Sequence, residues 1–335
     1  MTDAPITIVQ SILFGLVQGL TEFLPISSTA HLRILPEILG MTDPGAAFTA
    51  VIQLGTVLAV WIYFWSDLTS AIGGWFKSLR GSKDTPEARM GWAVFWGTIP
   101  IVVLGFLLKG PIKSDAVRSL YVIAGSLIFM GIIMMFAEKS GSKSRKSRAI
   151  TIRDGIVIGI WQCLALIPGM SRSGSTISGG LFAGFDRQAA ARVSFLLSVP
   201  SVTAAGLYEL ISERKNIMGP NLTPAIVATV VAFVVGYASI AWLIGFLQKK
   251  GIGVFVAYRI GLGILLIVLL QMGVLHAQSG AATAETSTPT TASNYVPPVA
   301  QINASAAHAK AWADAVRPNS GAVQTMTQPI EGGPD

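Results

Sequence analysis

The sequence predicts an all-α polytopic membrane protein with an inverted-topology repeat, in which each half is a re-entrant helix-loop-helix hairpin plus three transmembrane helices. Three observations predict this fold class. Apolar residues make up 52% of the 335 residues and charged residues only 12%, a balance that excludes an ordinary soluble domain. Six apolar runs are long enough to cross a bilayer, and two further apolar segments carry matching polar clusters.

The predicted spans each approach the ~20 residues that are needed to cross the hydrocarbon core. They cover about 48–66, 91–108, 119–137, 193–211, 223–247 and 254–275.

Two other apolar segments, about 6–40 and 155–186, are interrupted near their middles by Pro25 and by Pro168-Gly169. Proline removes a backbone donor and stops a helix. Broken backbone at membrane depth is tolerated only where protein or a wet cavity surrounds it. Both segments are therefore predicted to be re-entrant hairpins.

The two interrupted segments also resemble each other. Gln18 recurs as Gln162 and Ser27 as Ser171, both at an offset of 144 positions, with Ser28 matched by Arg172. We expect repeat one to cover about 6–137 and repeat two about 155–275. Since each half makes an odd number of crossings, the halves have opposite orientation and their interrupted helices meet near the midplane. The small-residue pairs Gly15/Gly19, Gly155/Gly159 and Gly180/Gly184 are expected to let the interrupted helices approach one another.

The distribution of positive charge predicts topology. The net charge is +7, but its clustering between spans favours the positive-inside rule over nucleic-acid binding, so we expect no nucleic-acid partner. The richer face carries Lys77, Arg80, Lys83, Arg89, Lys139, Lys143, Arg145, Lys146, Arg148, Arg153, Arg187, Arg192, Lys249, Lys250 and Arg259. This face is predicted to be cytoplasmic, with both termini outside. Residues 277–335 are rich in Ala, Thr, Ser and Pro and are predicted to form a disordered extracytoplasmic tail.

The first polar cluster has the features of an anion site. Gln18 and Glu22 are four positions apart and share a helix face. Beyond Pro25, the residues Ser27, Ser28 and Thr29 are suited to cap a second half-helix. The free amides and positive dipole end of such a helix start bind phosphate.

The second cluster repeats this arrangement after Pro168-Gly169. Ser171 and Ser173 lie in the capping stretch, Arg172 adds a planar fork of donors for bidentate phosphate binding, and Thr176 adds a hydroxyl. Two helix starts and one arginine suit an anion with several oxygens.

A carboxylate beside a phosphate is repulsive unless a cation bridges them, and Mg²⁺ characteristically uses one or two carboxylates together with substrate phosphates. Glu22 is therefore predicted to hold a divalent ion, helped by the neutral oxygen of Gln18. The alternative is that Glu22 pairs with Arg172 and neutralises it.

Ser28 and His31, three positions apart, suit a nucleophile and its base, or a phosphoryl acceptor and an acid. Arg33 is left out of the chemistry, as a side chain that reaches the membrane interface.

The stretches Gln18-x-x-x-Glu22-Phe-Leu-Pro-x-Ser-Ser-Thr-x-His31 and Pro168-Gly-x-Ser-Arg172-Ser-Gly-Ser-Thr176 closely resemble the undecaprenyl-diphosphatase family, also called bacitracin-resistance proteins. The likeness extends over about residues 6–275. It implies a membrane-embedded phosphatase domain over 1–276, in a bacterial cytoplasmic membrane. The implied reaction is hydrolysis of undecaprenyl diphosphate to undecaprenyl phosphate and phosphate, which recycles the lipid carrier for peptidoglycan synthesis and confers bacitracin resistance.

The resemblance also implies roles and partners. Its catalytic residues would be Glu22, Ser28, His31 and Arg172, and its substrate-binding residues Gln18, Ser27, Thr29, Ser171, Ser173 and Thr176. Glu22 and Gln18 would bind a divalent cation, Mg²⁺ with Ca²⁺ as the alternative. Related isoprenoid diphosphates and membrane lipid are expected partners, and a homodimer is left open. Many relatives have glutamate where Gln18 stands, so this chain offers the metal one carboxylate from that motif.

Three mechanistic alternatives stay open. Ser28, assisted by His31, attacks the terminal phosphorus, or it positions the water that does. The third alternative is that His31 attacks and forms a phosphohistidine.

A rival function is a lipid-phosphate flippase or transporter, because inverted repeats with broken helices are the usual plan for alternating access.

Overall fold

The first interrupted segment folds as two half-helices in the computed structural model, which describes residues 6–277 apart from 42, 82, 83, 113, 115 and 215–221. Helix α1 covers Ile8–Thr21 and α2 covers Ser28–Leu39. Thr7 and Gln10 form a capping box that starts α1. Its 14 residues give a length of about 21 Å, short of the ~30 Å hydrocarbon core. The break predicted at Pro25 is therefore confirmed.

The rest of the first half contains one helix that we did not predict. Helix α3 (Gly45–Tyr63) bends by 80° into α4 (Trp65–Leu79). It is followed by α5 (Pro86–Leu107), the single turn α6 (Lys109–Ile112) and α7 (Leu120–Ser140). Helix α4 is amphipathic: Leu68 and Ala71 are buried, whereas the polar Thr69, Ser70 and Lys77 are exposed. The bend lies at Phe64, where neither proline nor glycine interrupts the apolar pattern, so it could not be predicted from the sequence.

The second interrupted segment repeats the first with matching boundaries. After the short η1 (Ser147–Ala149), α8 (Ile152–Gln162) starts with a Thr151–Asp154 capping box. The single turn η2 (Cys163–Leu166) leads into the break, and α9 covers Arg172–Phe182. Both α8 and α9 begin 144 positions after α1 and α2. The local geometry therefore follows the offset read from the sequence.

The second half ends with three long helices, α10 (Arg187–Ser212), α12 (Leu222–Lys249) and α13 (Gly253–Gln271). Together with α5 and α7 they are long and apolar enough to cross a membrane, and the bent pair α3–α4 qualifies as a sixth span. The part of the chain that the structure describes has no β-strand. The chain is thus an all-α polytopic membrane protein. Apart from Ala277, the predicted tail over 277–335 lies outside the described residues.

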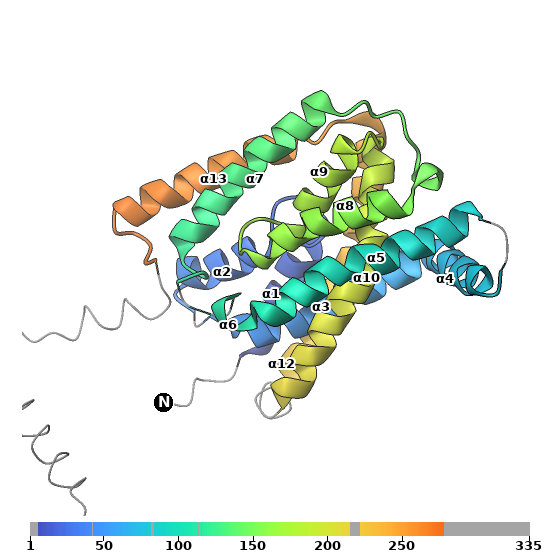
Figure 1. The fold of residues 1–335 in the computed structure, drawn as a ribbon. Coiled ribbons are helices and arrows are strands. Elements are labelled where there is room, and N and C mark those ends of the chain that lie inside the picture. Colours follow the sequence, from blue (N-terminus) through green and yellow to red (C-terminus); the bar gives the residue numbers. More distant parts are fainter. Residues whose placement is uncertain are drawn as a thin grey trace, which may run out of the picture. The chain divides into compact units, whose positions relative to one another are not determined.

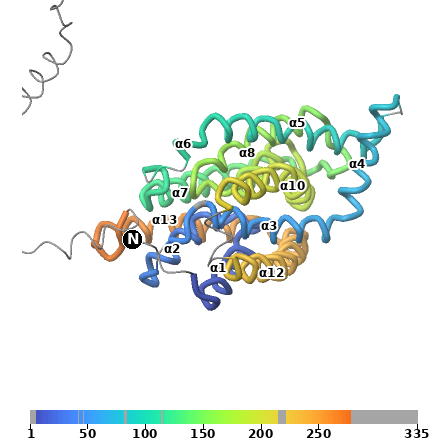
Figure 2. The backbone as a smooth tube through the Cα atoms, turned by 90° about the horizontal axis from the view of Figure 1, so that it is seen from below, coloured from blue at the N-terminus to red at the C-terminus, as the bar shows by residue number. Residues whose placement is uncertain are grey.

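The small-residue pairs pack differently from our expectation. Figures 1 and 2 show α1 beside α12 and α5 beside α8. A Cβ on Gly15 would lie 2.6 Å from the Ala228 carbonyl oxygen of α12, and one on Gly159 only 2.2 Å from that of Gly97 in α5. The prediction that these pairs bring the interrupted helices together is wrong. Gly15 and Gly19 bring α1 onto α12, and Gly155 and Gly159 bring α8 onto α5.

Two arginines are more buried than we expected. Arg33 is buried at 4% exposure and pairs with Glu37 and Asp43, at 3.6 and 3.7 Å. Arg259, which we counted with the loop cations of the cytoplasmic face, is fully buried within α13. The carboxylates of Glu37 and Asp43 explain the burial of Arg33.

Candidate active site

Ser27 and Ser171 start the second half-helix of each hairpin in the same unusual backbone conformation. Their φ angles are +77° and +69°, and each hydroxyl accepts from the backbone N–H three residues on, that of Ala30 or Gly174. A non-glycine residue at positive φ costs of order 1–3 kcal/mol, and such residues cluster at functional sites. Among the described residues only Lys143 shares this feature. Both predicted caps are confirmed, with Ser27 and Ser171 as the N-cap residues.

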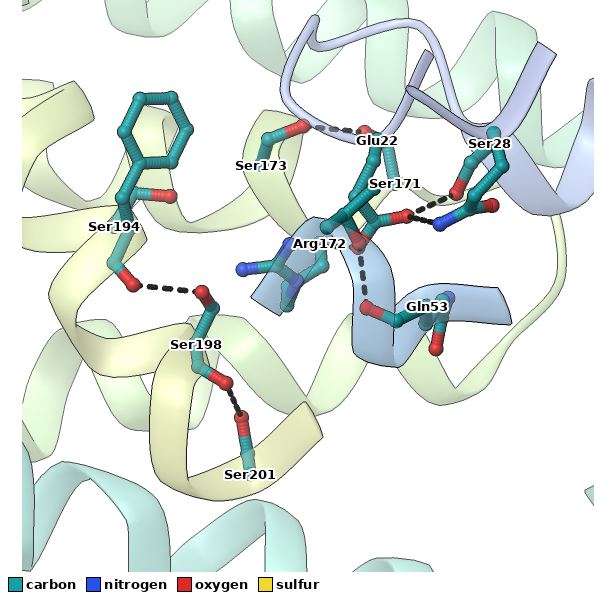
Figure 3. Close-up of polar contacts among 12 residues, drawn as sticks. Glu22, Ser28, Gln53, Ser171, Arg172, Ser173, Ser194, Ser198 and Ser201 are labelled. Carbon is teal, nitrogen blue, oxygen red and sulfur yellow. Dashed lines mark hydrogen bonds and ion pairs between the residues drawn. The ribbon is translucent and has the colours of Figure 1, made fainter. Parts of the chain in front are cut away.

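The carboxylate of Glu22 lies between the two hairpins (Figure 3). Its Oε1 accepts from Arg172 Nη2 at 2.7 Å. Its Oε2 accepts from Ser28 Oγ at 2.6 Å and from Gln18 Nε2 at 2.9 Å. Ser28 and Arg172 are the offset-matched first residues of α2 and α9. The structure therefore brings four predicted site residues together on one buried carboxylate, and the Glu22–Arg172 pair that we kept as an alternative is present.

Two polar atoms in this cluster have no hydrogen-bond partner among the residues that the structure describes. They are Gln18 Oε1 and Arg172 Nη1, and both are buried. A buried group left without a partner costs about 1–3 kcal/mol. One free acceptor and one free donor beside a shared carboxylate are suited to receive a ligand with both cationic and anionic parts.

The donor set fits a divalent cation that shares its coordination with a substrate. Within the described ranges, no three His, Cys, Asp or Glu side chains form a metal cage. Mg²⁺ rarely uses such a cage, because it takes one or two protein oxygens together with phosphates and water. The unpartnered Gln18 Oε1 and the adjacent carboxylate of Glu22 are oxygens of this kind.

Hydroxyls predicted to bind substrate instead tie the two hairpins together. Ser173 Oγ donates to the carbonyl oxygen of Leu24 at 3.0 Å, and the Gly169 N–H donates to Thr29 Oγ1 at 3.4 Å. Thr29 and Ser173 are themselves 144 positions apart. Each therefore holds the break of the opposite hairpin, an arrangement that single-sequence reasoning did not predict.

Thr176 points its hydroxyl away from the carboxylate cluster. Its Oγ1 donates to the carbonyl oxygen of Arg172 at 2.7 Å and lies 2.5 Å from Ser194 Oγ in α10. It supports the first turn of α9, the turn that carries Arg172.

His31 makes its contacts away from Ser28. Its Nδ1 lies 2.8 Å from the carbonyl oxygen of Ser27, and its Nε2 lies 2.7 Å from the Tyr258 hydroxyl of α13. The two rings also stack, with centroids 5.7 Å apart. The expected pairing of Ser28 with His31 is not seen, because the Ser28 hydroxyl donates to Glu22 instead.

Arg259 is the site residue that sequence reasoning missed. Its side chain is 0% exposed, and it donates to three backbone carbonyls in the breaks: Nη1 to Pro25 at 3.3 Å, and Nη2 to Gly169 at 2.8 Å and Met170 at 3.2 Å. The available signal was an arginine enclosed by the apolar run 254–275, which marks a functional candidate in a membrane helix.

Comparison with known proteins gives the family. The family model described as "Bacitracin resistance protein BacA" matches residues 11–265. Proteins named undecaprenyl-diphosphatase from Myxococcus xanthus and Chloroherpeton thalassium are 52% and 50% identical over 276 and 281 residues. These alignments cover 82% and 81% of this chain, and 93% and 99% of the two relatives. The relative of the same name from Micrococcus luteus is 50% identical over its full length. By this match, and with the motif residues gathered at one buried carboxylate, the chain belongs to the BacA family of bacitracin resistance proteins.

Proposed function

We propose that this protein hydrolyses undecaprenyl diphosphate to undecaprenyl phosphate and inorganic phosphate, and so recycles the lipid carrier for peptidoglycan synthesis and confers bacitracin resistance. The observation that carries the proposal is the contact of Arg172 and Ser28 with the two oxygens of Glu22, at the starts of two half-helices surrounded by apolar spans. The names of the relatives, which the chain matches over almost their whole length, support the substrate.

The geometry favours Glu22 over His31 as the base that acts on Ser28. The Ser28 hydroxyl already donates to Glu22 Oε2 at 2.6 Å, within the range that general-base catalysis requires. Ser28 Oγ attacks the terminal phosphorus while its proton passes to Glu22. The bond from that phosphorus to the bridging oxygen breaks, and its electron pair leaves with undecaprenyl phosphate. Water then attacks the phosphorus of the phosphoserine and the bond from phosphorus to Ser28 Oγ breaks. The proton held on Glu22 returns to Ser28 Oγ, the attacking water gives up a proton to Glu22, and inorganic phosphate leaves. In the alternative mechanism no phosphoserine forms. Ser28 and Glu22 then orient a water molecule that attacks the terminal phosphorus directly.

Arg172 supplies charge to the phosphoryl oxygens. It uses Nη2 on Glu22 and has Nη1 buried and unpartnered. An arginine placed in this way stabilises the charge that develops on equatorial oxygens during phosphoryl transfer. The backbone N–H groups in the first turns of α2 and α9 add a second set of donors.

A divalent cation, Mg²⁺ or Ca²⁺, would be held by Glu22 and Gln18 Oε1. When bound, it would neutralise the repulsion between Glu22 and the substrate oxygens. The remaining expectations belong to this proposal as well: a bacterial cytoplasmic membrane with both termini outside, related isoprenoid diphosphates as substrates, and a second copy of the chain in a homodimer.

The test is phosphate release from undecaprenyl diphosphate by the purified full-length protein in detergent. We expect turnover by the wild type and its loss in Glu22→Gln and in Arg172→Lys, each of which should elute as a folded species on size exclusion. Hydrolysis needs no membrane to separate two compartments. A protein that bound the lipid without releasing phosphate would therefore support the flippase alternative and overturn the hydrolase.

A further inference from the structure

Arg259 is a buried cation without a carboxylate partner. None of the ion pairs among the described residues includes it, and its Nε is buried without any partner. A charged side chain inside a membrane protein is costly, and a buried charge can often be replaced by apolar residues without loss of stability. Packing alone would be served better by leucine or methionine, so the guanidinium itself needs a reason.

The three carbonyls that Arg259 binds all belong to the breaks, and two of them are equivalent. Pro25 and Gly169 are 144 positions apart, the offset that relates the two hairpins. Breaking a helix leaves carbonyls without intrahelical donors, and proline within each break removes a further donor. A planar guanidinium with several fixed donors can reach two such loops at once, which a single ammonium cannot do equally well.

These contacts lie directly before the two helix starts. Pro25 is two residues before the cap Ser27, and Met170 immediately precedes the cap Ser171. Because a trans peptide directs its N–H opposite to its C=O, binding the Met170 carbonyl turns the Ser171 N–H away from Arg259. The side chain of Arg259 thereby holds the two loop segments that lead into the N-cap residues Ser27 and Ser171.

We propose that Arg259 is a positioning residue that sets the distance and angle between the starts of α2 and α9, and hence between Ser28 and Arg172. This inference rests on the proposed function. The Glu22–Arg172 contact does not act as a spacer alone, because in the proposed mechanism both side chains also act on the substrate. Two of the remaining ties, Ser173 with Leu24 and Gly169 with Thr29, are single hydrogen bonds. Arg259 touches both loops and none of the four residues of the carboxylate cluster.

The first experiment separates positioning from stability. Three full-length variants are purified: Arg259→Gln, Arg259→Lys and the control Arg145→Gln. Their kcat and KM are measured with undecaprenyl diphosphate, and their unfolding temperatures are measured separately. Arg145 is used as the control because it too donates to two backbone carbonyls, those of Ala183 and Ala149, away from the breaks, while unlike Arg259 it also pairs with the carboxylate of Asp154. We expect Arg259→Gln to lower kcat by about 10- to 100-fold, as small displacements of catalytic groups do. KM should change less than kcat, because Arg259 donates to backbone carbonyls of the breaks and to none of the four side chains of the carboxylate cluster. Arg259→Lys should recover part of kcat, and Arg145→Gln should affect only the unfolding temperature.

The second experiment does not depend on activity. Spin labels at Ile38 and Phe182, which are 60% and 42% exposed near the far ends of α2 and α9, report the distance between these helices. Both cysteines are introduced into a Cys163→Ala background, because Cys163 is the chain's single cysteine. We expect one narrow distance distribution in the wild type and in Arg145→Gln, and a broadened or shifted one in Arg259→Gln.

The outcomes are distinct. An unchanged distance distribution or an unchanged kcat in Arg259→Gln overturns the proposal, as does an equal loss of kcat in Arg145→Gln. If Arg259→Gln does not fold, Arg259→Lys decides by the same two measurements. A wild type that releases no phosphate, combined with a distance that responds to Arg259, would refute the hydrolase and leave the positioning role standing.

Discussion

The guanidinium of Arg172 lies 2.7 Å from the carboxylate of Glu22, although 150 positions separate the two residues in the sequence. Their side chains are only 10% and 4% exposed. Each comes from the interrupted region of a different hairpin, so this contact places the two hairpin breaks at one point. The pair is both the centre of the proposed chemistry and a source of instability if only one member is removed.

The first prediction concerns that instability. Removing one partner of a buried ion pair leaves an uncompensated charge, which costs about 3–5 kcal/mol, whereas replacing both partners is often close to neutral. We expect Glu22→Leu and Arg172→Met each to lower the thermal unfolding temperature, and the double variant to recover most of it while remaining inactive. Thermal unfolding in detergent, followed by tryptophan fluorescence, measures the four proteins. If the unfolding temperature of the double variant fell by the sum of the two single decreases, the two side chains would not stabilise each other.

The second prediction concerns the attacking atom. Ser28 donates to Glu22, whereas both ring nitrogens of His31 are engaged by Ser27 and Tyr258. We therefore expect rapid quenching with substrate labelled in its terminal phosphate to trap acid-stable label on serine. We expect Ser28→Ala to lose at least about 10³-fold in kcat, since removing the nucleophile leaves only binding and charge stabilisation.

His31→Asn serves as the comparison. Because its ring supports the cap of α2 from outside the carboxylate cluster, we expect a smaller loss of about 10-fold, as is typical of supporting hydrogen bonds. Acid-labile label on histidine, or a greater loss in His31→Asn than in Ser28→Ala, would instead make His31 the phosphoryl acceptor. Absence of any trapped label would favour direct attack by water.

These assignments show what the sequence could and could not predict. Gln18, Glu22, Ser28 and Arg172 were found because polar side chains within apolar segments are costly, and because proline marks the breaks. The partners of Ser28 and His31 could not be found in this way. The spacing between Ser28 and His31 suggested a pair, but which hydroxyl, carboxylate or ring lies nearest depends on how α1 and α13 pack against α2.

Arg259 shows the same limit at longer range. It contacts a carbonyl 234 positions away in the sequence, and no local pattern encodes such a contact. Counting Arg259 as a loop cation used its charge without its position inside an apolar run. The bend between α3 and α4 was missed for a related reason, since an amphipathic helix after a span continues the apolar pattern without a helix-breaking residue.

The third prediction concerns the metal. Gln18 Oε1 is a buried acceptor without a hydrogen-bond partner among the described residues, so replacing Gln18 by glutamate adds a second carboxylate where the proposed cation would lie. We expect chelator to abolish phosphate release and added Mg²⁺ to restore it. In Gln18→Glu, half-maximal restoration should occur at an at least severalfold lower Mg²⁺ concentration, because affinity for hard cations rises with the number of charged oxygen ligands.

Gln18→Leu should need more Mg²⁺ than the wild type. A readout apart from turnover is the rise in unfolding temperature with Mg²⁺, because a ligand that binds only the folded state stabilises it. Identical Mg²⁺ dependence in all three proteins would remove Gln18 from the proposed metal site.

The fourth prediction tests how the second hairpin is held against α5. A Cβ at Gly159 of α8 would lie 2.2 Å from the Gly97 carbonyl oxygen, whereas a Cβ at Gly125 of α7 meets no atom within 4 Å. Forcing apart a packed backbone contact costs about 1–3 kcal/mol, while alanine in an open helix position is favoured over glycine by about 0.5–1 kcal/mol. Gly159→Ala should therefore lower the unfolding temperature and Gly125→Ala should raise it slightly or leave it unchanged.

Gly159 is also only three positions before Gln162, at the end of the half-helix that leads into the second break. A shift of α8 away from α5 should consequently also move Arg172. Phosphate release by Gly159→Ala should therefore fall even at temperatures where this variant remains folded. Full activity together with a lowered unfolding temperature would mean that the break is held by Arg259 and the loop contacts, independently of how closely α8 approaches α5.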